Sequence, residues 1–299
     1  MSLAPRAVLV HRASEYEELL ARHGTHGQAD FFLSSRGRSI REGADRHHRA
    51  ARAVADVAAA VPPTWRQARV ERGDLDRFLF APEDVIVVVG QDGLVANAAK
   101  YLSGQPVIGI DPEPGRNPGV LVRHRPSSAA ALLAAAAAPG RTVEELTMVE
   151  ALTEDRERLL ALNEVYLGAP GHQTARYRIG SDDPSATMEA QASSGVLVGT
   201  GTGATGWLGS LGRLRADAPA LPGRTDRRLV WFVREAWASP VTGTAFVDGE
   251  LRRSQRLRVT VESDRLVAFG DGMESDALDL TWGQSVSVGI AETALRLVD

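Results

Sequence analysis

Hydrophobic and polar positions follow two different patterns in the two halves of the chain. In the first half, short apolar runs are separated by longer segments with helical periodicity. The pattern predicts strands over residues 7–10, 85–89 and 106–110, and helices over residues 14–22, 44–60 and 95–102. The first of these helices is expected to begin with a capping box, in which Ser14 is the N-cap and Glu17 stands three positions on. Strands that alternate with helices are typical of a parallel sheet with helices outside it.

The pattern changes after the alanine-rich stretch at residues 127–140, which we predict to be the closing helix of the first half. Beyond it, short apolar runs are separated by turn residues, which is typical of a mostly antiparallel β domain. Strands are predicted over residues 146–152, 159–167, 175–179, 195–199, 228–234, 243–247, 256–262, 266–269 and 285–290. The expected fold is therefore an α/β N-terminal domain, residues 1–140, followed by a β-rich domain, residues 141–299.

Composition narrows the classes of function. The 299 residues carry a formal net charge of -4, which gives no electrostatic reason to expect a nucleic acid or an anionic membrane as partner. The absence of cysteine excludes disulfides, zinc-thiolate sites and thiol nucleophiles. No signal-peptide pattern is visible, and no apolar run approaches the roughly 18 residues of a membrane span. We therefore expect a cytoplasmic protein.

The first candidate for chemistry is the stretch VIVVVGQDGL at residues 85–94. Ligands of open α/β sheets sit at the carboxyl ends of strands, and here a buried strand ends in Gly90, Gln91, Asp92 and Gly93. Glycines let backbone N–H groups approach phosphates, while an aspartate can orient a hydroxyl nucleophile or accept its proton. The same letters are also typical of a plain tight turn.

A second candidate is the stretch VLVGTGTGATGW at residues 196–207. It formally matches the GxGxxG dinucleotide fingerprint, but that fingerprint opens a βαβ unit, whereas the segment that follows here is broken by glycine and proline. What remains is a loop whose backbone N–H and hydroxyl groups could bind a polyanion or a sugar.

The third candidate is the pair Asn163 and Glu164, which interrupts an otherwise apolar strand. Strand alternation alone would allow one of the two side chains simply to face solvent. The histidines form no pattern with metal-ligand spacing, and we predict no protein metal site.

Together, the order and spacing of these motifs resemble the NAD kinase family, whose signatures are a GGDG motif, an Asn-Glu pair and a loop rich in threonine and glycine. The likeness covers roughly residues 80–299 and is closest to the mitochondrial-type branch, in the stretches PVIGIDPEPGR, LNEVYLG, SSGVLVGTGTGATGW and FGDGMESDALDL. In that branch the chain ends without a segment that returns to the first domain, and we expect the same here.

The resemblance implies roles for the candidate residues. Asp92 would engage the 2′-hydroxyl of the adenosine ribose of NAD as general base or orienting group. Gly90, Gln91 and Gly93 would lie at the phosphates of the donor, ATP with Mg²⁺. Asn163 and Glu164 would hydrogen-bond the dinucleotide, whose cleft would be lined by Thr200, Gly201, Thr202, Gly203 and Thr205.

One letter departs from the family motif. Gln91 stands where the family has the second glycine of GGDG, and it adds a side chain where the backbone is otherwise open to phosphate. Three hypotheses follow: an NAD kinase, a kinase of another small hydroxyl substrate on the same scaffold, and a non-catalytic dinucleotide-binding protein. Exposed β edges in the second domain lead us to expect a homo-oligomer.

Overall fold

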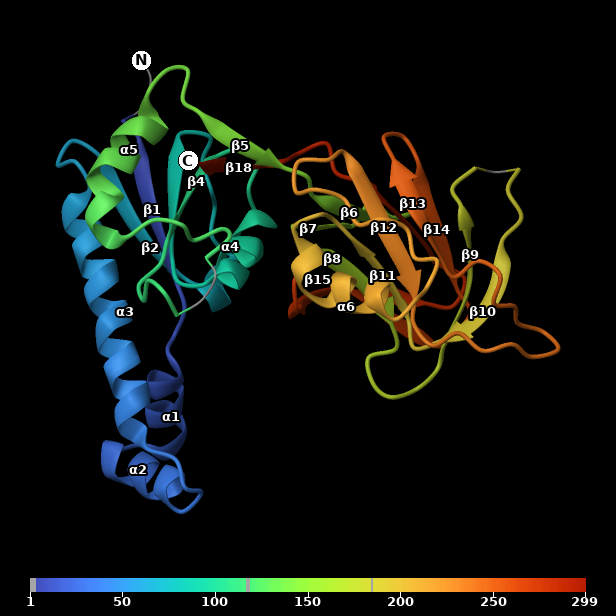
Figure 1. The fold of residues 1–299 in the computed structure, drawn as a ribbon, viewed down its shortest axis with the longest axis horizontal. Helices are drawn as coiled ribbons and strands as arrows, with labels where there is room; N and C mark the ends of the chain where they lie inside the picture. The colour runs from blue at the N-terminus through green and yellow to red at the C-terminus, as the bar shows by residue number, and fades with distance from the viewer. Residues whose placement is uncertain (1–3, 117–118, 184) are drawn as a thin grey trace. The chain divides into compact units, whose positions relative to one another are not determined.

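The structure is a computed structural model that describes residues 4–116, 119–183 and 185–299 (Figure 1). Its contacts divide the chain into two compact units. The first contains the chain up to Ala98, then Gln105–Val143 and Arg296–Asp299, and the second contains Ala99–Gly104 and Glu144–Leu295. Within the described residues, no helix combines the length and the apolar character needed to cross a membrane.

The first unit is built on a sheet with the strand order β2-β1-β3-β4-β18-β5. Its strands are β1 (Arg6–His11), β2 (Arg66–Glu71), β3 (Asp84–Val89), β4 (Pro106–Ile110), β5 (Val143–Leu146) and β18 (Leu295–Val298). β1 pairs in parallel with β2 and β3, and β4 pairs in parallel with β3 and β18. The prediction of a parallel sheet is confirmed.

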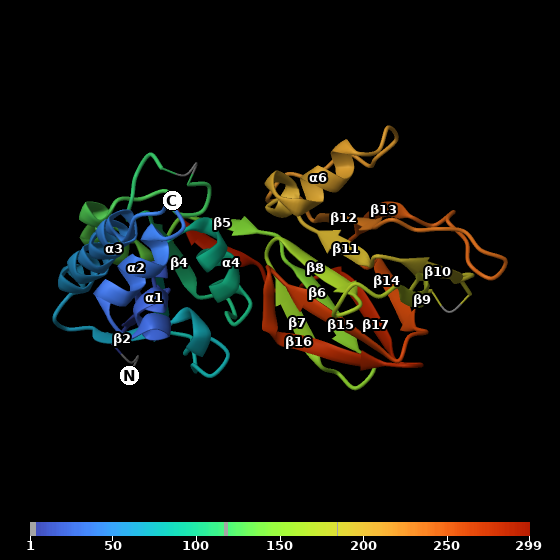
Figure 2. The same cartoon turned by 90° about the horizontal axis from the view of Figure 1, so that it is seen from below.

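Helices cover both faces of this sheet, which explains why β3 is buried along its whole length. The helices of this unit are α1 (Glu15–His23), α2 (His26–Ser34), α3 (Ile40–Ala60), α4 (Asp92–Ala99) and α5 (Ala129–Ala137). Of these, α3, α4 and α5 flank the sheet, while α1 and α2 pack against the start of α3 in a separate apolar cluster. Val57 of α3 and Leu133 of α5 belong to the same apolar cluster as Val87 of β3. Both views place α4 on the opposite face of the sheet (Figures 1 and 2). α1 begins with the predicted capping box.

The second unit contains two antiparallel sheets of six strands each, with the orders β10-β9-β14-β17-β6-β7 and β13-β12-β11-β8-β15-β16. The strands of the first are β6 (Val149–Thr153), β7 (Arg158–Ala161), β9 (Ala175–Ser181), β10 (Glu189–Ser193), β14 (Arg256–Val261) and β17 (Ser285–Ile290). Those of the second are β8 (Glu164–Gly168), β11 (Val196–Gly199), β12 (Arg228–Val233), β13 (Asp248–Arg252), β15 (Arg265–Gly270) and β16 (Met273–Thr281).

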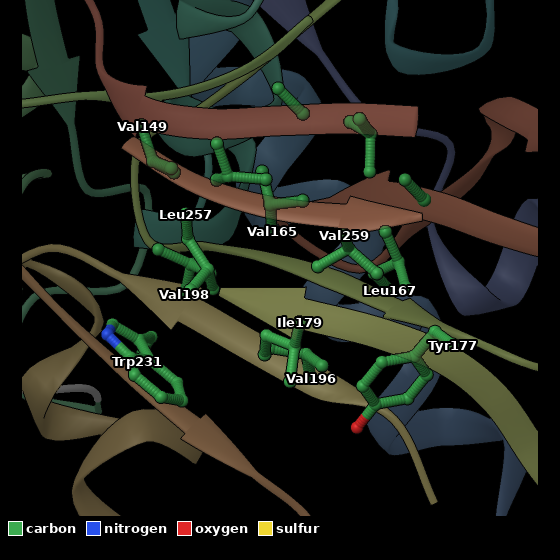
Figure 3. Packing of buried hydrophobic residues seen from close by; sticks show 14 of the residues in the cluster. Val149, Val165, Leu167, Tyr177, Ile179, Val196, Val198, Trp231, Leu257 and Val259 are labelled. Atoms are coloured by element: carbon green, nitrogen blue, oxygen red, sulfur yellow. The ribbon is translucent and has the colours of Figure 1, made fainter. Parts of the chain in front are cut away.

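Side-chain alternation decides which residues of the second sheet reach the core. Val165 and Leu167 of β8 pack between the sheets against residues such as Val259 of β14 (Figure 3). Tyr166, between them, faces the other way, into a smaller cluster with Leu208 of the short helix α6 (Trp207–Arg213). The outer face of this sheet, covered in part by α6, is therefore the face that also receives Glu164.

Several predicted elements differ from the structure. The strand expected at residues 159–167 is two strands, β7 and β8, because the N–H groups of Leu162 and Asn163 donate to a side chain instead of a neighbouring strand. The strand expected at residues 146–152 is likewise divided between β5 and β6. No strand lies at residues 243–247; β13 follows at Asp248–Arg252. α4 begins at Asp92, three residues before the predicted start.

The expectation that the chain ends without a returning segment is wrong. β18 pairs in parallel with β4 of the first unit, through the register Arg296 to Pro106 and Leu297 to Val107. Four residues are too short a run to separate from the preceding strands by periodicity, which is why the sequence pattern did not reveal this strand.

Candidate functional site

Asp92 lies where a buried strand gives way to a helix. β3 ends at Val89, the N–H of Gly90 donates to the carbonyl of Ile110 at 3.0 Å, and Asp92 is the first residue of α4. A carboxylate at a helix N-terminus is stabilised by the helix dipole. The strand therefore holds Asp92 at the carboxyl edge of the parallel sheet, where ligands of such sheets bind.

The carboxylate of Asp92 is already engaged by the protein. Its Oδ1 accepts the N–H groups of Leu121 at 2.8 Å and Val122 at 3.0 Å, and its Oδ2 accepts that of Val120 at 3.0 Å. These bonds fix the orientation of Asp92 and hold the segment that follows β4. The donors are 28 to 30 residues away in sequence, and no motif signals them.

The residues on either side of Asp92 differ in their surroundings. A Cβ at Gly90 would lie 2.9 Å from the Leu94 side chain, so packing alone favours glycine there. A Cβ at Gly93 would meet no atom within 4 Å, so local packing gives no reason for glycine at that position. Gln91, the residue that departs from the family motif, is exposed.

In the second unit, Asn163 and Glu164 lie at the bend between β7 and β8. Their N–H groups and that of Leu162 donate to the carboxylate of Asp271, which stands between β15 and β16. The two side chains are partly exposed. Sequence reasoning missed Asp271, although the Asp-Gly pair at residues 271–272 is a common turn signal.

The loop after β11 folds against this bend. The N–H of Thr200 donates to the carbonyl of Asn163 at 2.9 Å, and its hydroxyl donates to the carbonyl of Leu162 at 2.5 Å. β11 also pairs antiparallel with β8, placing Gly199 opposite Glu164. The two motifs, roughly 35 residues apart in sequence, are thus parts of one site. The flanking strands are antiparallel, so the loop does not open a βαβ unit.

Two glycines of the loop are required by close packing. A Cβ at Gly203 would lie 2.6 Å from the carbonyl oxygen of Asn163 and 2.8 Å from Oε2 of Glu164. A Cβ at Gly201 would lie 2.1 Å from the carbonyl oxygen of Gly223. The Glu164 carboxylate therefore lies directly against the loop backbone, at a distance that only glycine permits.

The threonines of the loop have different surroundings. Thr200 is fully engaged by the backbone, and its Oγ1 also accepts the N–H of Thr202 at 3.1 Å. Thr205 makes a long contact, 3.5 Å, with the carbonyl of Thr202. Within the described residues, Oγ1 of Thr202 is buried and has no hydrogen-bond partner. A buried unsatisfied hydroxyl is costly, so this atom is suited to a ligand group.

The charge state of Glu164 is set by its surroundings. Burial and, to a smaller extent, the nearby charge of Asp271 together raise the pKa of Glu164 from 4.5 to about 7. Burial also raises the pKa of Asp271, while the N–H groups of Leu162 and Asn163 oppose that rise. Glu164 can therefore both donate and accept hydrogen bonds near neutral pH.

A cavity of about 430 Å³ opens on the same face of the sheet. Tyr166 and Trp207 stack in its wall with ring centroids 5.4 Å apart, and the guanidinium of Arg234 lies 5.1 Å from the Trp207 ring. Phe269 of β15 completes the aromatic side. Tyr166, Trp207 and Phe269 all lie within the family-like stretches of the sequence, but none of them was predicted as a site residue. In the part of the chain that the structure describes, no group of three or more His, Asp or Glu side chains is arranged to hold a metal ion.

Comparison with solved structures identifies the fold. An NAD kinase from Archaeoglobus fulgidus, solved in complex with ATP, superimposes with a TM-score of 0.58 at 17% sequence identity, over 98% of this chain and 93% of that one. The chain has the NAD kinase fold. No family model and no curated protein matches the sequence. At this level of identity the likeness shows the fold, and the chemistry has to be argued from the residues.

Proposed function

We propose that the protein is a phosphotransferase that moves the γ-phosphoryl group of ATP, or of a related donor, to the 2′-hydroxyl of NAD to form NADP. The observation that carries the proposal is the fold match over 98% of the chain to an NAD kinase solved with ATP. The finer likeness to the mitochondrial-type branch belongs to this proposal as well.

In the proposed reaction the residues act by positioning. Asp92, held by three backbone N–H groups, orients the acceptor hydroxyl through its Oδ2, which accepts one protein hydrogen bond and keeps room for another. The backbone at Gly90 and Gly93 approaches the donor phosphates. Phosphoryl transfer depends mainly on such positioning and on neutralising charge.

Asn163, Glu164 and the loop from Thr200 to Thr205 hold the dinucleotide. Glu164 hydrogen-bonds a ribose hydroxyl, and the unpartnered Oγ1 of Thr202 gains a partner when the dinucleotide binds. Mg²⁺ neutralises the donor phosphates when bound. Because the described side chains form no metal cluster, we assign it to the donor nucleotide and to no protein site.

A second candidate function is supported by two observations on the first unit. The Asp92 carboxylate is committed to three backbone donors, and Gln91 places a side chain in the family's glycine position. Both features fit a protein that binds a dinucleotide without phosphorylating it. A homo-oligomeric state and a cytoplasmic location stay predictions from the sequence.

The test is a matrix of donors and acceptors. Purified protein is incubated with Mg²⁺, with ATP, another triphosphate or polyphosphate as donor, and with NAD, NADH or a nucleoside as acceptor, and NADP is read through an NADP-specific dehydrogenase. We expect NADP from NAD with at least one donor. If NAD raises the melting temperature but every donor fails, the binding-protein function replaces the kinase. Product from only a non-dinucleotide acceptor would show a kinase of another hydroxyl.

A further inference from the structure

Asp271 occupies an unusual backbone conformation in the turn between β15 and β16. Its φ is 53°, in the left-handed region that residues other than glycine rarely adopt. Aspartate is among the few residues that tolerate this region. A residue kept in such a conformation costs stability unless the surroundings compensate, so its contacts should be informative.

Four hydrogen bonds of Asp271 lead to the Asn163–Glu164 bend. Oδ2 of Asp271 accepts the N–H of Leu162 at 2.7 Å, and Oδ1 accepts the N–H groups of Asn163 at 2.7 Å and Glu164 at 3.3 Å. In return, the N–H of Asp271 donates to the carbonyl of Glu164 at 3.1 Å. One residue thus makes four hydrogen bonds to three consecutive residues, and its carboxylate sits in a nest of backbone N–H groups.

The hairpin that carries Asp271 is itself held by a buried cation. Nζ of Lys100 lies 2.7 Å from the Asp276 carboxylate and 3.3 Å from the carbonyl of Gly270, and Lys100 is 7% exposed. The hydroxyl of Tyr101 donates to Asp276 at 2.6 Å. The charge of Lys100 also lowers the pKa of Asp271, against the larger effect of burial. The turn is therefore fixed on both sides of Asp271.

We propose, building on the function proposed above, that Asp271 is a positioning residue for dinucleotide binding: by holding the backbone of residues 162–164 it sets where the Asn163 and Glu164 side chains point. We call the hydrogen bonds between Asp271 and residues 162–164 the clamp. Because the carbonyls of Leu162 and Asn163 accept two hydrogen bonds from Thr200, the clamp also fixes the start of the threonine-glycine loop. Asp271 needs no contact with the substrate for this role.

Two variants and one control test the role. Asp271→Ala removes both oxygens, Asp271→Asn keeps one and preserves the shape, and the control, Asp264→Asn, alters an exposed carboxylate in the turn before β15 that does not line the cavity. The Kd for NAD is measured by calorimetry. KM and kcat are measured with the donor found above, and the exchange of the amide hydrogens of residues 162–164 is followed by NMR or mass spectrometry. Asp271→Asn keeps the test valid if the alanine variant does not fold.

We expect Asp271→Ala to raise the Kd and KM for NAD on the order of tenfold or more, since hydrogen bonds to a charged group are lost. kcat should change less, Asp271→Asn should give an intermediate effect, and Asp264→Asn should match the wild type. Because Asp271 raises the pKa of Glu164, both Asp271 variants should also move the pH dependence of NAD binding toward lower pH. A residue that only stabilises the hairpin would not raise the Kd and KM for NAD selectively over kcat.

The outcomes separate this role from the proposed function. If the wild type binds NAD and a folded Asp271→Ala variant binds it equally well, the positioning role is overturned. If the wild type binds no NAD, the proposed function fails. Amide exchange then tests separately whether Asp271 holds the backbone of residues 162–164. Faster exchange at residues 162–164 in the variant supports the clamp, and unchanged exchange overturns it.

Discussion

Two carboxylates in the candidate motifs, those of Asp92 and Glu164, differ in their hydrogen bonding. Asp92 accepts three backbone N–H groups and has a fixed orientation. Glu164 is partly exposed, lies against Gly203 with no hydrogen-bond donor from the described residues on its carboxylate, and has a pKa raised to about 7. A carboxylate that accepts several backbone hydrogen bonds has a fixed orientation, whereas a polar group without a protein partner can hydrogen-bond a ligand.

This contrast suggests a division of labour. The first unit holds Asp92 in a fixed orientation. In the second unit, the buried Oγ1 of Thr202 has no hydrogen-bond partner among the described residues, and the Glu164 carboxylate accepts no hydrogen bond from them. Rigid placement is what catalysis of phosphoryl transfer needs, and unsatisfied buried polar groups are what selective recognition needs. Changes in the two units should therefore affect different measurements.

The largest effect is expected from Asp92→Asn. If Asp92 orients the acceptor hydroxyl, kcat for NADP formation should fall on the order of 10²–10⁴-fold, while the Kd for NAD changes little. Asp56→Asn, at an exposed position of α3, is the control. A kcat within twofold of the wild type, in a variant that melts at the same temperature, would contradict the role of Asp92.

Gly203→Ala should abolish NAD binding through crowding. The new Cβ would lie 2.6 Å from the Asn163 carbonyl, so loop and bend must separate, at a cost of about 1–3 kcal/mol of folding free energy. Gly43→Ala, where a Cβ on α3 would meet nothing within 4 Å, should be neutral or stabilising. Urea unfolding and NAD titration check both variants. An unchanged NAD affinity in Gly203→Ala would show that the loop takes no part in NAD binding.

Glu164 should make stability depend on pH. Its folded pKa of about 7 exceeds the ordinary value of 4.5, so the folded state holds the extra proton and is favoured at low pH. That contribution is lost as pH rises through about 7. Without ligand, the wild type should therefore lose stability between pH 6 and pH 8, and Glu164→Gln should lose less.

Denaturant titrations at the two pH values measure this difference, with Glu18→Gln, an exposed change on α1, as control. An equal pH dependence in the wild type and in Glu164→Gln would show that Glu164 titrates in the ordinary range.

The smallest effect is expected from Thr202→Val. The valine has nearly the shape of threonine and removes a hydroxyl that is buried without a partner, so the unliganded protein should be unchanged or more stable by about 1–3 kcal/mol. NAD binding should weaken at the same time. Thr200→Val, in which the hydroxyl bonds to Leu162 and Thr202 are lost, should destabilise the protein instead.

Local patterns predicted much of this architecture. The buried strand before Gly90, the capping box at Ser14 and the alternation of strands and helices are set by neighbours in sequence, and all three are present. The motifs at Asn163 and at the threonine-glycine loop were identified as separate candidates, and their spacing suggested one family. Hydrogen bonds between β8, β11 and the loop explain why they lie together.

Long-range contacts account for what the sequence did not predict. The donors to Asp92 and the turn residue Asp271 are distant in sequence from the groups they hold, and a turn signal does not tell which backbone the turn will contact. The division of β7 from β8 follows from the same bonds to Asp271. β18 pairs with a strand 190 residues earlier, Arg296 with Pro106, and such pairing is not encoded in a local period.

The most direct test of the account is the position of the transferred phosphate. The wild-type protein is incubated with NAD, Mg²⁺ and the donor, and the dinucleotide product is examined by ³¹P NMR and mass spectrometry. We predict a dinucleotide carrying one added phosphate on the 2′-hydroxyl of the adenosine ribose, formed by the wild type and by Asp56→Asn but strongly reduced in Asp92→Asn. NAD recovered unchanged, despite measurable binding, would contradict the account.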